Sequence, residues 1–207
     1  MERAAESLKG RLRASLKEKA AEIGRDVRER MRPAGHGEVQ FAEPPIYRCA
    51  EPHGAQSKSE CLVIACNSFR FLRQTQEFLF GALGLNDYDL MAVPGGVQWL
   101  ALPDLLPKHN KVARGVAEYV VNKHGIKRAV CIAHEGCSAY RDEGTLGALA
   151  HMLTGKNVFE HQVEQLRRVG RNLKTWFGVE TELYYASVDD GAVVFHRVAL
   201  AAEEGAK

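Results

Sequence analysis

Three short runs of mostly apolar residues divide the middle of the chain. They are Cys61–Cys66, which reads CLVIAC, then Tyr88–Val93 and Arg128–Ala133. Continuous apolar runs of this length, bounded by turn residues, are typical of strands that are buried on both faces of a parallel sheet. Helical patterns separate the runs, so we expect right-handed crossovers between neighbouring parallel strands.

Apolar residues at helical spacing predict three helices around these strands. The residues that connect the second strand to its helix, 97–110, are expected to be irregular because Pro103 and Pro107 limit helix formation. The first predicted helix runs from Phe71 up to Gly84. The second carries Val112, Val116, Tyr119 and Val120 and stops at Gly125. The third is capped by Asn157 and ends at Gly178, and its apolar face consists of Phe159, Val163, Leu166, Leu173 and Trp176.

The last strands form a hairpin. Residues 182–188 and 192–198 alternate as strands do and flank Asp189-Asp190-Gly191, which is a strong signal for a tight turn. The predicted fold class is therefore α/β, with a mostly parallel central sheet, helices on its faces and an antiparallel edge at the C-terminus.

The N-terminal part has a different pattern. Residues 1–32 repeat apolar side chains at i, i+4 spacing among charges of both signs, which predicts a long amphipathic helical arm that packs on the body or on a second subunit. A solvated, partly frayed tail is the alternative. Residues 33–60, rich in Pro, Gly and Ser, read as an extended linker, residues 61–200 as the folded domain and residues 201–207 as a tail.

Composition narrows the functional classes. The chain has 207 residues and a formal charge of +2, and it shows no arginine-rich patch, so a small-molecule partner is expected and no nucleic acid. No apolar run reaches membrane-spanning length, and the first residues do not resemble a targeting signal, which favours a cytoplasmic location and no membrane partner. Five cysteines, an odd number, favour free thiols or metal ligands over disulfides.

Two of these cysteines and one histidine stand where strands end. Cys66 closes the first buried strand, and His134 and Cys137 follow the third. Because parallel strands end at the same edge of a sheet, the three side chains can meet there. Two Cys and one His leave a fourth position open, as a catalytic zinc requires. Three buried core residues are the alternative, and Cys61 and Cys131, within the strands, are expected to be inert core thiols.

Around these residues the chain resembles the β-class carbonic anhydrases. The likeness covers roughly residues 60–198: a strand ending in Cys, a strand running into a glycine turn, a strand ending in His-x-x-Cys, a long helix and a closing hairpin. The resemblance implies that Cys66, His134 and Cys137 bind Zn²⁺ and that the chain forms homodimers or larger homo-oligomers. In that family a helical N-terminal arm packs on the partner subunit.

The chain departs from the family beside the first ligand. The family pattern is Cys-x-Asp-Ser-Arg, and here the residues are Cys66-Asn67-Ser68-Phe69-Arg70. The resemblance implies that Ser68 orients a zinc-bound hydroxide and that Arg70 stabilises the anionic product. Ser68 can instead cap the following helix, and Arg70 can pair with a surface carboxylate.

The turn after the second strand departs as well. Pro94-Gly95-Gly96 replaces the family's Arg-Asn-Ala-Gly type of turn. Its two glycines permit a close approach of another backbone, although a turn without functional meaning is the commoner explanation.

Three functions remain open at this stage. In the first, a zinc-bound hydroxide hydrates carbon dioxide to bicarbonate, as in a carbonate dehydratase. In the second, it attacks another small electrophile, and Glu135, Asp142 or Glu143 replaces the missing base. In the third, a protein side chain fills the fourth position and the chain is a non-catalytic zinc-binding homologue. Glu135 can also point to solvent without any role in catalysis.

Overall fold

A computed structural model describes residues 58–142 and 156–200, together with Lys19, Tyr47 and Ala50. Contacts divide the chain into two units, residues 1–53 and 54–207, and the described strands and long helices all belong to the second. The predicted N-terminal arm and the tail 201–207 lie outside the described residues, apart from Lys19, and so does most of the linker. Among the described residues, no helix has the length and apolar content that crossing a bilayer requires.

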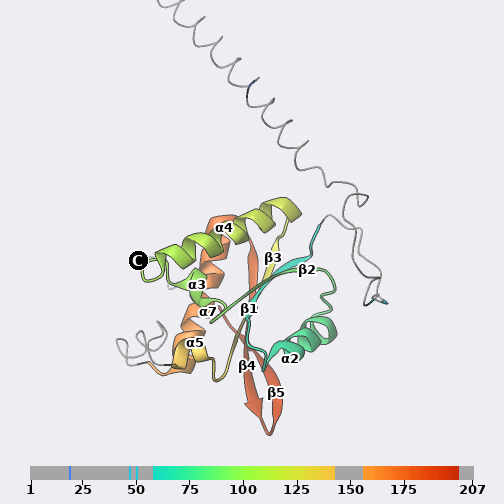
Figure 1. Ribbon diagram of the computed structural model, residues 1–207, viewed down its shortest axis with the longest axis vertical. Coiled ribbons are helices and arrows are strands. Elements are labelled where there is room, and N and C mark those ends of the chain that lie inside the picture. The colour runs from blue at the N-terminus through green and yellow to red at the C-terminus, as the bar shows by residue number, and fades with distance from the viewer. Residues whose placement is uncertain (1–18, 20–46, 48–49, 51–57, 143–155, 201–207) are drawn as a thin grey trace, which may run out of the picture. The chain divides into compact units, whose positions relative to one another are not determined.

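The described part is a five-stranded sheet with helices on both faces (Figure 1). The strand order is β2-β1-β3-β4-β5, with parallel pairing from β2 to β4 and an antiparallel β4–β5 edge. This topology confirms the predicted fold class. The strands are β1 (Cys61–Cys66), β2 (Tyr88–Val93), β3 (Arg128–His134), β4 (Glu180–Asp189) and β5 (Ala192–Val198).

Two apolar clusters hold the layers together, one on each face of the sheet. Leu62 and Ile64 of β1 face helices α3 (Gln98–Ala101), α4 (Pro107–His124) and α7 (Val158–Phe177). Val63 faces the opposite side, where α2 (Leu72–Glu77) continues into a π-helical segment, η1 (Phe78–Ala82). Because β1 is covered on both faces, its continuous apolar sequence is what a central strand needs.

Helix α4 differs from its prediction at its start and on its buried face. The expectation that residues 97–110 are irregular is wrong in two places, because α3 lies within this segment and α4 begins at Pro107. Proline at the first helical position loses no hydrogen bond. The small residues Ala113 and Ala117 of α4 are buried, whereas the side chains of Val112, Val116 and Tyr119, which predicted the helix, are 60%, 45% and 64% exposed. The predicted stop at Gly125 is confirmed by its φ of 71°.

The capping predictions had two outcomes. Asn157 caps α7 as predicted: its side chain accepts the N–H of Glu160, whose carboxylate accepts the N–H of Asn157 in return. The alternative role of Ser68 as a helix cap is wrong, because α2 begins four residues later, at Leu72, and Phe71 occupies its N-cap position.

Candidate metal centre

The three predicted ligands lie together at one edge of the sheet. β1 pairs with β3 in parallel, so Cys66 and His134 end on the same edge, and Cys137 follows His134 in the next turn. One ligand atom from each side chain lies within 4.8 Å of the other two. The structure thus brings together residues that are 71 positions apart in the sequence.

The spacing of the two sulfurs matches a tetrahedral metal site. Cys66 Sγ and Cys137 Sγ are 3.8 Å apart. Two sulfurs that each lie about 2.3 Å from one zinc ion, at the tetrahedral angle, are about 3.8 Å apart. The sulfurs therefore need no rearrangement to share an ion.

His134 presents a nitrogen without a protein partner. Its side chain is 3% exposed, and its Nδ1 lies 2.9 Å from the carbonyl oxygen of Glu135. Since a carbonyl only accepts, Nδ1 carries the proton and Nε2 keeps its lone pair. Among the residues that the structure describes, Nε2 has no hydrogen-bond partner although it is buried. Burying a polar atom without a partner is costly, and a metal ion would supply the missing contact.

The thiol electrostatics favour one thiolate at the site. A hydrogen bond from the Cys137 thiol, with smaller contributions from the neighbouring imidazole of His134, lowers the pKa of the Cys66 thiol to about 4, against the opposing effect of burial. The same hydrogen bond, together with burial, raises the pKa of Cys137. By contrast, burial raises the pKa of Cys61 to about 11 and also raises that of Cys131, as expected for inert core thiols. The donor set, two sulfurs and one imidazole nitrogen, fits zinc.

Gly96 holds the end of β1 in place. Its φ is +52°, and a Cβ built there would lie 2.9 Å from both the carbonyl carbon of Ala65 and the amide nitrogen of Cys66. Only glycine allows the turn after β2 to approach the backbone of the first ligand this closely. Gly96 thus has the close backbone contact that the sequence allows, whereas Gly95 borders the side chains of Gln98 and Ala139.

Arg70 contacts the ligand loop, residues 134–137, instead of a carboxylate. Its Nη2 donates a hydrogen bond of 2.6 Å to the carbonyl oxygen of Gly136, between His134 and Cys137. Within the described ranges, no acid lies within 4.0 Å of Arg70, so the predicted surface ion pair has no partner there. Ser68 is half-buried, two residues after Cys66, and Phe69 is 84% exposed.

The acids proposed as replacement bases have different surroundings. Glu135 Oε2 accepts the N–H of Val188 at 2.9 Å, so this carboxylate binds β4 instead of pointing freely into solvent. Asp142 follows the short helix α5 (Ser138–Arg141) and lines a cavity with His109. Glu143 lies outside the described residues.

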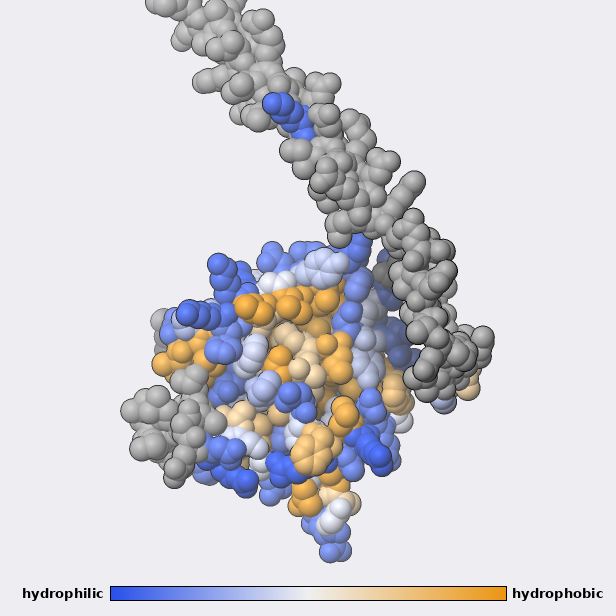
Figure 2. Space-filling model, viewed as in Figure 1, coloured by the Kyte–Doolittle hydropathy of each residue, from blue (hydrophilic) through white to orange (hydrophobic). Residues whose placement is uncertain are grey.

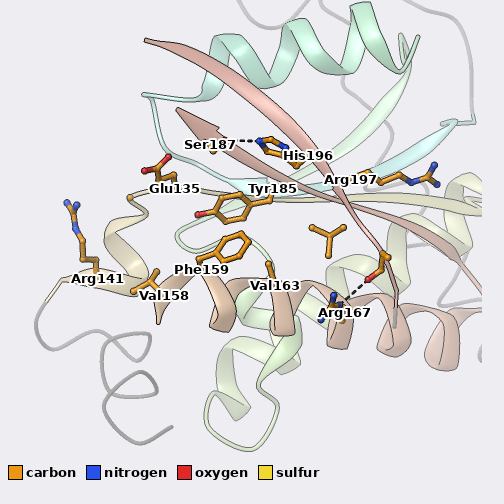
Figure 3. A pocket seen from close by; sticks show the side chains of 13 residues that line it. Glu135, Arg141, Val158, Phe159, Val163, Arg167, Tyr185, Ser187, His196 and Arg197 are labelled. Atoms are coloured by element: carbon orange, nitrogen blue, oxygen red, sulfur yellow. Dashed lines mark hydrogen bonds between the residues drawn. The ribbon is translucent and has the colours of Figure 1, made fainter. Parts of the chain in front are cut away.

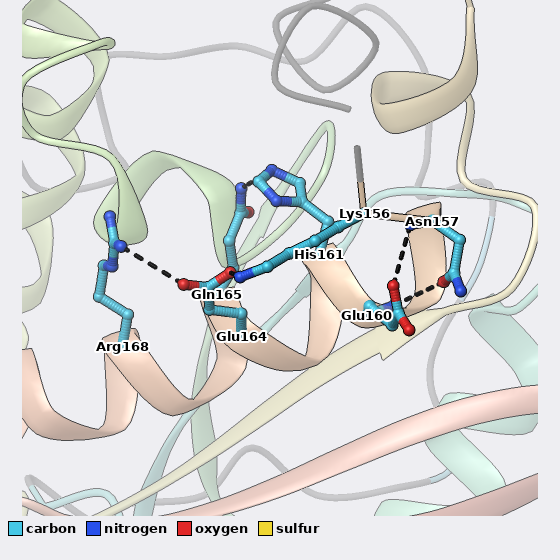
Figure 4. A network of polar contacts seen from close by, with 7 residues as sticks. All are labelled: Lys156, Asn157, Glu160, His161, Glu164, Gln165 and Arg168. Atoms are coloured by element: carbon cyan, nitrogen blue, oxygen red, sulfur yellow. Dashed lines mark hydrogen bonds and ion pairs between the residues drawn. The ribbon is translucent and has the colours of Figure 1, made fainter. Parts of the chain in front are cut away.

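Helix α7 holds the ligand loop and the residues after it through hydrogen bonds from two of its side chains. Gln162 is 1% exposed, and its Nε2 donates to the carbonyl oxygen of His134 at 3.1 Å. One turn later, Gln165 Oε1 accepts the hydroxyl of Tyr140, which follows Cys137 by three residues, at 2.5 Å. Figure 4 shows Gln165 beside His161 and the capping contacts that fix the start of α7. Two buried amides thus tie both sides of the ligand loop to one helix.

Sequence reasoning did not identify the residues that surround the ligands. The ring of Phe71 packs 4.3 Å from the ring of His134, although the sequence pattern placed Phe71 on an apolar helix face. Nothing in the pattern marked Gln162 or Gln165, because a glutamine in a helix is usually exposed. The Asn157 cap was the available signal, since it fixes the start of the helix that carries both.

No protein-family model and no curated protein matches the chain. Three solved β-carbonic anhydrases are similar in structure. Isoform I from Trichomonas vaginalis is 15% identical, with a TM-score of 0.42, over 70% of this chain and 87% of that one. The enzyme from Aspergillus fumigatus is 18% identical (TM-score 0.46; 92% and 90% covered), and one of two tetrameric enzymes from Sordaria macrospora is 16% identical (TM-score 0.44; 89% and 95% covered). Likenesses this distant do not transfer residue roles to this chain.

Proposed function

We propose that this chain is a zinc enzyme that hydrates carbon dioxide to bicarbonate, with Cys66, His134 and Cys137 as the metal ligands. One observation carries the proposal: Cys66, His134 and Cys137 each bring a ligand atom within 4.8 Å of the other two, the two sulfurs have the spacing that a tetrahedral ion requires, and the buried Nε2 of His134 has no hydrogen-bond partner among the described residues. Three protein ligands leave a fourth position for solvent. When bound, zinc would supply the Lewis acidity that turns water into a nucleophile at neutral pH.

The residues beside the ligands have distinct proposed roles. Ser68 presents a half-buried hydroxyl two residues after Cys66, where it can accept a hydrogen bond from solvent at the site. Arg70 fixes the ligand loop through Gly136 and keeps further N–H donors for an anionic product. Phe71 packs on His134 and limits the rotation of its ring.

The replacement of the family's Asp by Ser68 favours a second candidate, hydrolysis of a different small electrophile at the same centre. Two thiolate ligands offset the charge of the ion, so the acidity of bound water depends strongly on neighbouring groups. Ser68 carries no charge, and Arg70 is bonded to a backbone carbonyl. A chain that binds zinc and does not hydrate carbon dioxide would support this candidate, or a zinc site without catalysis.

Stopped-flow carbon dioxide hydration by the zinc-loaded chain tests the proposal. We expect Cys137→Ala to abolish activity, because it removes a ligand. Cys131→Ala is the matched control, since it removes another buried cysteine that lies within β3. Equal losses in both variants, or no activity in the parent chain, would contradict the proposal.

Ser68→Asp tests whether the missing acid limits the rate. A restored carboxylate can accept the proton of the bound water, and because a positioned general base typically contributes about 100-fold or more, we expect hydration at neutral pH to rise by at least about tenfold. An unchanged rate in a variant that still binds zinc would indicate a centre built for another substrate.

We also propose that the chain acts as a homo-oligomer in the cytoplasm. The resemblance to β-class carbonic anhydrases and the amphipathic pattern of residues 1–32 support the oligomer, and five cysteines, an odd number that favours free thiols, support a reducing compartment. Fractionation of cells that express the full chain tests the location.

A further inference from the structure

A cavity of about 860 Å³ lies beside the metal centre, between α7 and the β4–β5 hairpin (Figure 3). Cavities of roughly 300 to 1,000 Å³ are the usual size of small-molecule sites. Glu135 and Gly136, from the loop between the ligands His134 and Cys137, form part of its wall, whereas the three ligands do not line it. The cavity is thus a separate space from the proposed metal site.

The middle of the cavity is apolar. Phe159 and Val163 point into it from successive turns of α7, and Tyr185 of β4 lies opposite them (Figure 3). The edge of one ring meets the face of the other, with 4.8 Å between the ring centroids of Phe159 and Tyr185, yet Phe159 remains 52% exposed. A half-exposed aromatic ring on a concave surface offers contact area to the apolar body of a ligand.

The charges around this apolar centre are mostly positive. Figure 3 shows Arg141 and Arg167 on opposite sides of Phe159. The Nε of Arg167 donates to the carbonyl oxygen of Ala199 at 3.0 Å, and within the described part of the chain no carboxylate lies within 4.0 Å of either guanidinium. Among the described residues that line the wall, Glu135 is the one acid, and it accepts the N–H of Val188. Three arginines thus line the cavity, Arg141, Arg167 and Arg197, against one acid among the described residues, so the cavity favours an anion.

Polar groups also come from the hairpin. Ser187 of β4 and His196 of β5 face the cavity, with 2.9 Å between Oγ and Nε2. A hydroxyl and an imidazole can each exchange hydrogen bonds with a ligand's oxygen. A few polar groups around an apolar floor are the usual composition of a site for a small organic molecule.

We propose that this cavity binds a small aromatic carboxylate. The ring would pack against Phe159 and Tyr185, and the carboxylate would pair with Arg167, whose planar guanidinium suits two parallel hydrogen bonds. The inference needs no metal, so it stands or falls independently of the proposed carbon dioxide hydration.

Isothermal titration calorimetry of the full chain with 3-phenylpropionate tests this site, and 3-phenylpropionamide is the matched neutral ligand. We expect saturable binding of one acid per chain and binding of the amide at least about tenfold weaker, because hydrogen bonds to charged groups contribute more than neutral ones. No saturable binding of the acid, or equal affinity for acid and amide, would overturn the proposal.

Two variants of neighbouring arginines locate the site. Arg167→Met removes the charge and keeps an apolar stem, and it is expected to weaken binding of the acid by about tenfold or more. Arg168→Met is the matched control, because Arg168 is the next residue of α7, is absent from the cavity wall and lies 3.8 Å from Glu164. Equal losses in the two variants would contradict the assignment.

A third variant guards against misfolding of Arg167→Met. Val163→Trp fills the cavity without removing a charge, and we expect it to abolish binding of the acid while leaving zinc content unchanged. Full binding by a folded Val163→Trp chain would place the acid elsewhere and overturn the proposal.

Discussion

Cys66 and His134 are prepared for a metal by their own neighbours. The carbonyl of Glu135 fixes the proton of His134 on Nδ1, and the neighbouring Cys137 thiol stabilises the thiolate of Cys66. His134 Nε2 and the Cys66 sulfur are thereby left with lone pairs that a metal ion can bind. This preparation has a consequence that can be measured without any metal present.

The metal-free chain should react at Cys66 well below neutral pH. Since the pKa of Cys66 is lowered to about 4, its thiolate predominates above that pH, and alkylation by iodoacetamide should stay nearly constant from pH 6 to pH 9. An ordinary thiol, with a pKa of about 8.5, loses about tenfold in rate per unit below that value. Peptide mass spectrometry identifies the modified residue.

Cys61 is the internal control for this experiment, because burial raises its pKa to about 11. It should stay unmodified while Cys66 reacts, and added zinc should protect Cys66. A rate at Cys66 that falls tenfold between pH 7 and pH 6 would contradict the lowered pKa.

At the scale of the elements, the turn after β2 positions the first ligand. Gly96→Ala adds a methyl group against the backbone of Ala65 and Cys66. We expect it to lower the free energy of unfolding by more than the roughly 1 to 2 kcal/mol that alanine costs in a left-handed conformation, and to weaken the retention of zinc. Gly84→Ala is the matched control: its φ of +63° is similar, and its Cβ would meet no atom within 4 Å. Urea unfolding and zinc content measure both effects, and equal behaviour of the two variants would contradict a positioning role.

The sequence allowed the elements to be predicted wherever a local signal dominates. The buried runs at β1 and β3, the Asp189–Gly191 turn and the Asn157 cap each depend on neighbouring residues, and all four are present. The start of α4 was not predicted because a proline such as Pro107 can either interrupt a helix or occupy its first position. Its buried face was missed because small alanines pack against α3, while larger apolar residues remain exposed.

The candidate site was predictable to the same extent. The ligand residues follow from strand ends, whereas the contacts of Arg70 with Gly136 and of Gln162 with His134 depend on tertiary packing that no local pattern encodes. The exchange of Asp for Ser68 could be identified in the sequence, but its chemical effect depends on those contacts.

At the scale of the whole molecule, the exposed apolar side chains of α4 bear on assembly. Val112, Val116 and Tyr119 are each at least 45% exposed, and Figure 2 shows apolar side chains gathered along this helix. Exposed apolar patches are frequent at subunit interfaces. We expect light scattering of the full chain to give at least twice the monomer mass of 22.9 kDa. The monomer mass at micromolar concentration would contradict the homo-oligomer.

The metal content of the purified full chain tests the central claim most directly. Inductively coupled plasma mass spectrometry should find about one zinc per chain in the parent and in Cys131→Ala, and almost none in Cys137→Ala. A parent chain without zinc, or a Cys137→Ala chain that keeps as much zinc as the parent, would contradict a metal centre built from Cys66, His134 and Cys137.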